Sequence, residues 1–170
     1  MTIFTIGHST RPIETFLGLL AGHAVQRLID IRKMPHSRHN PQFGREPLAE
    51  SLQAAGIHYT HLPGLGGLRR PRPDSVNSGW RNSGFRGFAD YMQTPAFETA
   101  LGGCLDLATA ERVVLMCAEG VPWRCHRSLI ADALVVRDVD VREITSTTTA
   151  RPHVLTPWAR VEGTHIVYAA

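Results

Sequence analysis

One short stretch of the chain, residues 113–127, contains the residue types of a nucleophile, a base and an anion ligand. It begins with an apolar run typical of a buried strand, and a loop with Gly and Pro then leads to a helical pattern over residues 128–136. In α/β proteins, pockets for anions and reactive groups form where a strand passes through such a loop into a helix. The side chains that could do chemistry here are Cys117, Glu119, Cys125, His126 and Arg127.

Cys125 is the strongest candidate for a reactive thiol. It stands just before the predicted helix, between Arg124 and Arg127 and next to His126. Free amide groups at a helix start and cationic neighbours favour a thiolate, and they lower the pKa of a cysteine from about 8.5 by one to several units. We therefore predict Cys125 as a nucleophile or redox thiol, with packing of a small apolar residue as the alternative.

The other two cysteines occupy less reactive positions. Cys117 ends the apolar run, so an inert core thiol is the first interpretation, and a resolving partner for Cys125 is the second. Cys104 falls within a helical pattern and is predicted to be structural. An odd number of cysteines, three, is unlike the disulfide framework of a small secreted protein.

The spacing around these thiols excludes two well-known kinds of site. A phosphatase-type loop needs an arginine six positions after its cysteine, but Trp123 stands there after Cys117. The corresponding position after Cys125 is Ala131. The cysteines and histidines also lack the short spacing of a zinc knuckle, so no metal is predicted. Zinc held across separate loops by Cys117, Cys125, His126 or His8 is the alternative.

Hydrophobic periodicity predicts strands that alternate with helices. This alternation is typical of an α/β fold with a mainly parallel five-stranded sheet and helices on both faces, as in three-layer Rossmann-like and flavodoxin-like folds. We predict one domain over residues 1–170, in which residues 146–170 form a C-terminal extension. The predicted strands are 3–6, 26–31, 57–62, 112–116 and 141–145. The first predicted helix begins at Pro12, and the other four cover 46–55, 85–92, 94–108 and 128–136. The extension is predicted to contain a terminal hairpin. Its strands are Val154-Leu155 and residues 165–168, and its turn lies near Glu162-Gly163.

Polar residues gather at one edge of the predicted sheet. Because parallel strands point the same way, the loops that follow them share one edge, and ligands bind there. The loops at the opposite edge, near residues 22–24, 56 and 108–110, are chemically plain. The candidate residues in the loops after the strands are His8, Ser9, Asp30, Arg32, Ser37, Arg38, Gly66, Gly67, Cys117, Glu119, Cys125, His126 and Arg127.

Three arginines of this edge are predicted to hold an anionic group. Arg32, Arg38 and Arg127 suit this role because the planar guanidinium binds phosphate or carboxylate through two hydrogen bonds. The preferred interpretation of Asp30 is an internal pair with Arg32 that fixes its loop.

The remaining candidates divide between chemistry and substrate binding. His8 is expected to act as an acid or base, because a plain turn does not require an imidazole. Ser9 is predicted mainly to cap the first helix, with a phosphate hydrogen bond as the alternative. Glu119 is a candidate general base or ribose ligand, and a salt bridge to Arg124 or Arg127 is its alternative. Ser37 and the Gly66-Gly67 pair are predicted to bind substrate, since glycine lets the backbone approach a phosphate closely.

A long segment without apolar periodicity, residues 68–84, is rich in arginine. A loop of this length inside a compact domain is usually functional or mobile. Its functional interpretations are a lid or a contact with a nucleic-acid backbone, and a solvated loop is preferred. Together with the two residues that follow it, this segment gives the arginine-rich stretch 69–86, which contains Arg69, Arg70, Arg72, Trp80, Arg81, Phe85 and Arg86.

Five groups of residues follow one another along the chain: Thr5-Ile6-Gly7-His8-Ser9, Asp30-Ile31-Arg32 with Pro35 and Ser37-Arg38, Tyr59 through Leu65-Gly66-Gly67, Gly87-Phe88 with Tyr91-Met92, and Leu115 through Glu119 with Cys125-His126-Arg127. In this order they resemble the DUF488 family, a bacterial and archaeal family of unknown function, over residues 3 to about 145. The resemblance implies a compact α/β domain and leaves the activity open. Ile31 stands where the family often has Val, a conservative difference.

Composition and charge limit the choice of function. The net charge of +3 is mild, and seventeen arginines accompany a single lysine, Lys33, which is compatible with anion recognition or with a biased coding sequence. The chain lacks an apolar run of membrane-spanning length and a signal-peptide pattern at its start, so we expect a cytoplasmic protein without a membrane partner. No GxGxxG follows a strand, and no cofactor is predicted.

Three functional hypotheses follow from these residues. The first is an enzyme that hydrolyses, or transfers a group from, a nucleotide-like or other phosphorylated small anionic substrate, with Cys125, His126, Glu119, His8 and Cys117 as catalytic residues. The second is a non-catalytic module that binds a nucleotide or nucleic acid. The third is a thiol redox sensor that uses Cys117 and Cys125. The oligomeric state stays open.

Overall fold

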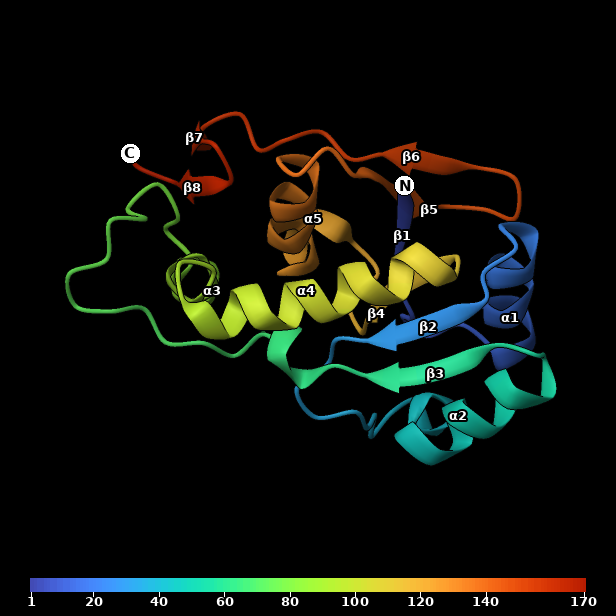
Figure 1. The fold of residues 1–170 in the computed structure, drawn as a ribbon. Helices are drawn as coiled ribbons and strands as arrows, with labels where there is room; N and C mark the ends of the chain where they lie inside the picture. The colour runs from blue at the N-terminus through green and yellow to red at the C-terminus, as the bar shows by residue number, and fades with distance from the viewer.

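A six-stranded sheet forms the middle layer of the computed structural model, which describes residues 1–170 (Figure 1). Its first five strands along the chain run parallel, and the sixth pairs antiparallel with the fifth. In spatial order the strands are β3 (His58–His61), β2 (Arg27–Asp30), β4 (Val113–Cys117), β1 (Thr2–Gly7), β5 (Asp140–Ile144) and β6 (Ala150–Pro152).

Helices cover both faces of this sheet (Figure 1). One face carries α1 (Ile13–Gly22) and α2 (Arg45–Ala54), and the other carries α3 (Ser83–Tyr91), α4 (Pro95–Ala110) and α5 (Arg127–Val135). None of the helices could span a lipid bilayer, since each lacks the necessary length of apolar sequence. Three short 3-10 turns, η1 (Pro41–Phe43), η2 (Pro63–Leu65) and η3 (Pro122–Arg124), lie in the loops after β2, β3 and β4.

The buried side chains of the strands divide the core into two layers. In β4, Val113, Leu115 and Cys117 belong to the layer under α3, α4 and α5, whereas Val114 and Met116 belong to the layer under α1 and α2. Successive residues of a strand point to opposite faces, so a strand covered on both sides is apolar throughout. This double burial explains why β4 is the clearest strand in the sequence.

The connections after β1 and β4 diverge, and this divergence creates the candidate site. After β1 the chain crosses through α1 to β2, whereas after β4 it crosses through α5, on the other face, to β5. Ligands of open α/β sheets bind at such a switch point, outside the carboxyl ends of the strands. The two loops are joined there, because the His8 and Ser9 amides donate to the carbonyl oxygens of Cys117 and Ala118 at 2.8 and 2.9 Å.

Gly7 allows the loops after β1 and β4 to meet. A Cβ atom at this position would lie 1.8 Å from the carbonyl oxygen of Glu119, far inside contact distance. Any larger residue would push the two loops apart, so this glycine is required by the close approach of two backbones.

The predicted α/β class, the parallel strands and the five helices are confirmed, with small differences at the ends of elements. The prediction of five strands misses β6. This strand comes from the Thr-rich connector, and the Thr145 and Ser146 amides close its turn by donating to the Thr149 carbonyl at 3.0 and 3.2 Å. β6 covers the otherwise unpaired edge of β5. Only three residues pair, which is too few for a visible alternation of side chains.

A terminal hairpin is also confirmed, but the prediction of Val154-Leu155 as its first strand is wrong. The hairpin consists of β7 (Arg160–Glu162) and β8 (His165–Val167), and Gly163 takes a φ of +63° in the turn. Val154 lies outside any strand and is 79% exposed, so its apolar side chain does not mark a buried strand. The residues that follow the turn do reach the core, because Ile166 and Tyr168 are buried there.

The arginine-rich loop is irregular, as predicted, but it is fixed by α3 and by the C-terminal segment. The buried Asp90 carboxylate accepts hydrogen bonds from the Arg72 amide, the Ser75 hydroxyl and the Asn77 amide group at 2.8, 2.6 and 2.7 Å. Burial alone would raise the pKa of Asp90, but these hydrogen bonds hold it below the usual value. The Gly79 amide also donates to the Tyr168 carbonyl at 2.6 Å, and Figure 1 shows this loop beside the terminal hairpin.

Candidate functional site

Two thiols lie against each other at the wall of a cavity beside the switch point. The sulfur atoms of Cys117 and Cys125 are 2.8 Å apart, and the two residues are 3% and 6% exposed. The cavity has a volume of about 390 Å³. We call it the thiol cavity, and its lining consists of Arg32, Lys33, Met34, His36, Gly67, Leu68, Asn82, Gly84, Phe85, Cys117, Ala118, Glu119, Arg124, Cys125 and His126.

The two thiols have opposite tendencies to ionise. The hydrogen bond with Cys117, followed by the influence of His126 and Arg127, lowers the pKa of Cys125 to about 4 against the effect of burial. Burial, followed by the adjacent Cys125, raises the pKa of Cys117. The Arg127 amide at the start of α5 also donates to the Cys125 sulfur at 3.5 Å. The thiolate form is therefore favoured at Cys125 over Cys117.

His126 is oriented to exchange a proton with Cys125. Its Nε2 lies 3.0 Å from the Leu65 carbonyl oxygen, and its Nδ1 lies 3.7 Å from the Cys125 sulfur. A carbonyl oxygen can only accept, so Nε2 carries a hydrogen and Nδ1 is the nitrogen that can take the thiol proton. Gly67 leaves room for this ring, because a Cβ atom there would lie 3.0 Å from Nδ1.

Arg127 fixes the loop between β4 and α5 through the hydrogen bonds of its guanidinium. Its guanidinium donates to the Cys117 sulfur at 2.8 Å, to the carbonyl oxygens of Glu119 and Gly120, and to the Glu143 carboxylate at 2.6 Å. Arg127 is 1% exposed and does not line the thiol cavity. The structure thus gives this predicted anion ligand four partners within the chain.

Glu143 is the partner of Arg127 that the sequence analysis missed. Glu143 also accepts a hydrogen bond from the Thr5 hydroxyl, and Thr5 and Glu143 are paired in register on β1 and β5. The available signal was a carboxylate inside a predicted strand, between the buried Val141 and Ile144. A charged residue at such a position normally has a buried partner.

The predicted Asp30–Arg32 pair is confirmed. Two guanidinium nitrogens of Arg32 donate to the two carboxylate oxygens of Asp30 at 2.9 and 2.8 Å, and both residues are buried. The Tyr59 hydroxyl donates to the same carboxylate at 2.6 Å. Burial, then the contact with Asp30, raises the pKa of Tyr59. Arg32 lines the thiol cavity while its charge is matched by Asp30.

His8 contacts Arg32 but does not line the thiol cavity. Its ring stacks on Phe43 with centroids 4.3 Å apart, and its Nε2 is 3.4 Å from the Arg32 guanidinium. His8 is 2% exposed, and burial lowers its pKa, so the neutral imidazole is the stable form. Its Nδ1 lies 2.8 Å from the Ser9 carbonyl oxygen.

The prediction that Ser9 caps the first helix is wrong. Pro12 occupies the cap position of α1, and no side chain makes a capping hydrogen bond there. Ser9 instead takes a φ of +52° and joins its backbone to the loop after β4. The turn after β1 is therefore shaped by its contact with Ala118 and not by the helix that follows.

Only some of the other predicted ligands line the thiol cavity. The Glu119 carboxylate accepts from the Val121 amide at 2.9 Å at the cavity wall, and the alternative salt bridge to an arginine does not form. Ser37 accepts from the Asn40 amide at 3.1 Å and lies outside the cavity. Arg38 is exposed and also lies outside it, while Gly67 but not Gly66 belongs to the lining.

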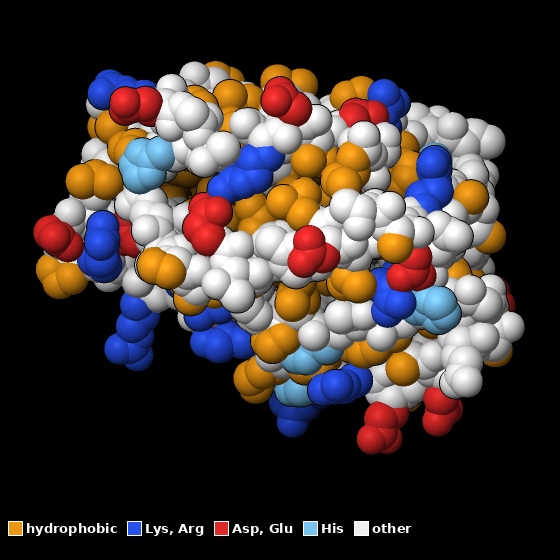
Figure 2. Space-filling model, viewed as in Figure 1, with side chains coloured by type: hydrophobic (Ala, Val, Ile, Leu, Met, Phe, Trp, Pro, Cys, Tyr) orange, Lys and Arg blue, Asp and Glu red, His pale blue; other side chains and the backbone are white.

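Two exposed cations belong to the thiol cavity although the sequence analysis did not select them as ligands. Lys33 directly follows Arg32, and Arg124 directly precedes Cys125. On the face of the molecule that Figure 2 shows, Lys and Arg side chains project at the lower left and acidic side chains project at the lower right. Proximity in sequence to Arg32 and Cys125 was the signal that could have selected both residues.

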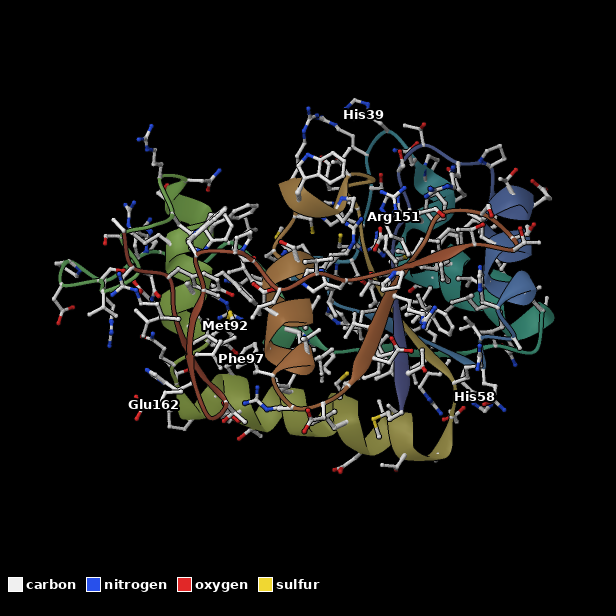
Figure 3. The ribbon with its side chains drawn as sticks, turned by 90° about the horizontal axis from the view of Figure 1, so that it is seen from above. His39, His58, Met92, Phe97, Arg151 and Glu162 are labelled. Carbon is white, nitrogen blue, oxygen red and sulfur yellow. The ribbon has the colours of Figure 1, made fainter.

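A second cavity of about 450 Å³ lies on the other side of the loop between β4 and α5. Arg127 and Glu143 contribute to its lining together with the exposed Trp123 and with Arg151, which is labelled in Figure 3. Neither cysteine lines it. The loop thus has the thiols on one side and their supporting ion pair on the other. No three His, Cys, Asp or Glu side chains gather in a set that could hold a metal ion.

Comparison with known proteins identifies the family of the chain. No curated protein and no solved structure matches it. Residues 12–134 match the family described as a domain of unknown function, DUF488, and this match includes α1 through nearly all of α5. It contains both cysteines of the thiol cavity and excludes the hairpin at the C-terminus. The chain therefore belongs to the DUF488 family.

Proposed function

We propose that this protein is an enzyme in which the Cys125 thiolate attacks a small anionic substrate, phosphorylated or nucleotide-like, bound in the thiol cavity. The observation that carries the proposal is the combination of position and charge at Cys125. Its sulfur reaches the wall of an open cavity, and a pKa of about 4 leaves it ionised near neutral pH. A thiolate in such a position suits covalent catalysis by hydrolysis or group transfer.

His126 would serve as the base and acid of this reaction. Nδ1 faces Cys125 and can take its proton before the substrate binds. When the thiolate bonds to the transferred group, the bond to the leaving group breaks, and the imidazolium can protonate that leaving group. Water or a second substrate would then release the group from the sulfur, with the neutral imidazole as base.

Lys33 and Arg124 would supply the charge that attracts an anion. Both are exposed at the cavity, and neither takes part in an ion pair of the fold. Arg32 is paired with Asp30 and adds no net charge. The Cys125 thiolate and the His126 imidazolium cancel each other, and Glu119 is the acidic residue of the lining. The cavity thus keeps a positive balance that favours phosphate or carboxylate ligands.

Binding can be tested by thermal unfolding with inorganic phosphate and with AMP as probes. We expect these probes to raise the Tm of the wild-type chain, because a ligand that binds only the folded state stabilises it. The double variant Lys33→Met with Arg124→Met should lose the shift. Arg38→Met is the matched control, since Arg38 is exposed outside the cavity, and it should keep the shift. An equal loss in the control, or no shift in the wild type, would contradict the proposal.

Catalysis is tested separately with Cys125→Ser. This variant should keep the Tm shift with phosphate and lose hydrolysis of p-nitrophenyl phosphate, whose product is followed by its colour. Wild-type hydrolysis that survives the substitution would remove the thiolate from the mechanism. Binding without hydrolysis of p-nitrophenyl phosphate by the wild type would favour a non-catalytic module.

A further inference from the structure

We infer that Cys117 and Cys125 form a reversible dithiol–disulfide pair, in which Cys125 reacts first with a hydroperoxide and Cys117 then resolves the oxidised sulfur. This activity uses the same Cys125 thiolate as the proposed enzyme. It goes beyond the proposed function because it is an oxidation of the protein and requires no anionic substrate.

The distance between the sulfur atoms is the first support. They are 2.8 Å apart, and a disulfide bond is about 2.05 Å long, so a small rotation of the side chains closes the gap. The loop between the two cysteines returns the chain to the end of β4, which places them together without a change of fold. Both residues reach the thiol cavity, which a small peroxide can enter from solvent.

The chemical difference between the two thiols is the second support. Cys125 carries the thiolate, which is the form that attacks a peroxide. Cys117 retains its proton next to that charge and is the thiol available for the second step. Cys104 offers a comparison within the same chain: it is fully buried, lies outside the cavity, and burial raises its pKa to about 12.

The two steps balance as follows. The Cys125 thiolate attacks one oxygen of hydrogen peroxide, the O–O bond breaks, and a sulfenic acid forms while hydroxide leaves. The Cys117 sulfur then attacks the Cys125 sulfur, the S–O bond breaks, and the departing hydroxyl group takes the Cys117 proton to leave as water. Together the two sulfurs lose two electrons and the peroxide is reduced to water.

Arg127 supports the second step, and most of its contacts do not depend on the redox state of the two cysteines. Its guanidinium donates to the Cys117 sulfur at 2.8 Å, where negative charge develops as that sulfur loses its proton. Its bonds to the Glu119 and Gly120 carbonyls and to Glu143 involve neither sulfur. The loop therefore stays attached when the disulfide closes, and the change is confined to the thiol cavity.

Counting reactive thiols tests the inference on the full-length chain. The reduced protein is treated with one equivalent of hydrogen peroxide, denatured, alkylated with N-ethylmaleimide and weighed by mass spectrometry. Untreated protein should take up three alkyl groups, one for each free cysteine, and the oxidised protein should take up one, on Cys104. Reduction with dithiothreitol before alkylation should restore the original count.

Variants assign the role of each thiol. Cys117→Ser should stop at the Cys125 sulfenic acid, which dimedone traps, and Cys125→Ser should react with peroxide at least about tenfold more slowly. Cys104→Ser is the matched control and should still form the disulfide. The inference is overturned if the wild type keeps three alkylatable thiols under these conditions, or if Cys104→Ser prevents the loss of the other two.

The outcome is separable from that of the proposed function. The peroxide assay contains no anionic ligand and the phosphate assay contains no oxidant, so each result is obtained independently of the other. If the disulfide forms but phosphate and AMP have no effect on the Tm, only the proposal of an anionic substrate is contradicted. If phosphate raises the Tm but the thiols do not react with peroxide, only the inference of a redox pair is contradicted.

Discussion

Two groups of charged side chains lie at opposite ends of the parallel sheet. Figure 3 labels His58, which belongs to the group at the amino end and lies at the start of β3. Near the carboxyl end, Arg127 and Glu143 meet at 2.6 Å with 1% and 13% of their side chains exposed. At the amino end, Arg27 and Glu111 meet at 2.7 Å with 20% and 18% exposed. The sequence had indicated that the second edge was chemically plain, and in fact both edges carry an arginine–carboxylate pair.

The difference between these edges is the environment of their charges. The amino-edge pair is partly hydrated, and its third member, His58, is 67% exposed. At the carboxyl edge, the buried charges have fixed partners: Arg127 pairs with Glu143, and Arg32 pairs with Asp30. Loss of one member of a buried pair leaves an unmatched charge, whereas loss at a hydrated pair is compensated by water.

Breaking the two arginine pairs should give the largest difference. Arg127→Met should lower the free energy of unfolding by about 3 to 5 kcal/mol, because Glu143 and two loop carbonyls lose their buried donor. Arg27→Met is the matched control at the amino edge, and its loss should stay within about 1 kcal/mol. Urea denaturation of both variants measures these values. Equal losses would show that burial does not distinguish the edges.

The pH dependence of alkylation sharpens the comparison at the thiols. With a pKa of about 4, Cys125 should react with iodoacetamide at an almost constant rate from pH 8 to pH 6. An ordinary thiol of pKa about 8.5 would slow roughly 80-fold over that interval. Peptide mass spectrometry assigns the labelled residue, and Cys104 serves as the unreactive internal control. A Cys125 rate that falls in parallel with an ordinary thiol would contradict its ionised state.

The sequence was sufficient to predict the sheet and the edge at which the loops after its strands meet. Apolar runs and helical spacing marked the strands and helices, and parallel strands required the following loops to meet at one edge. The fold prediction succeeded because it depends on local patterns and on the single direction of the strands. The choice of Cys125 as a reactive thiol stays a prediction.

Which residues of the candidate site support the fold and which face the cavity could not be predicted in the same way. Arg127 supports a loop because Glu143, far along the chain on β5, reaches its guanidinium. Likewise, Arg32 is matched by Asp30, while Lys33 next to it faces the cavity. Which of several arginines is free for a ligand depends on such tertiary partners, and a sequence without coordinates does not contain them.

Tyr59→Phe tests a hydrogen bond to a buried carboxylate without removing a charge. The Tyr59 hydroxyl donates to Asp30 at 2.6 Å, and its loss should cost about 1.5 kcal/mol of unfolding free energy. Asp30 keeps its two bonds with Arg32, so the cost should stay below that of Arg127→Met. Tyr91→Phe is a comparable control, since that hydroxyl donates to the neutral Gly64 carbonyl and should cost less. A larger loss in the control would contradict the importance of the buried charge.

The smallest effect is expected at Glu111, and its size depends on pH. Hydrogen bonds from Arg27 and His58 hold the pKa of Glu111 below its usual value, so the folded state favours the carboxylate more strongly than the unfolded chain does. This stabilisation is present above the ordinary glutamate pKa of about 4.3 and is lost as the pH falls through the lower value of the folded state.

Glu111→Gln should therefore cost about 0.2 to 1 kcal/mol at pH 7, and the difference from the wild type should shrink as the pH falls below the ordinary glutamate pKa of about 4.3. Urea denaturation of both proteins at pH 7 and pH 3 measures it. Glu50→Gln, an exposed change on α2 without an ion pair in the fold, should differ little from the wild type at either pH. A cost for Glu111→Gln that is equal at pH 7 and pH 3 would mean that packing, and not charge, stabilises the amino edge.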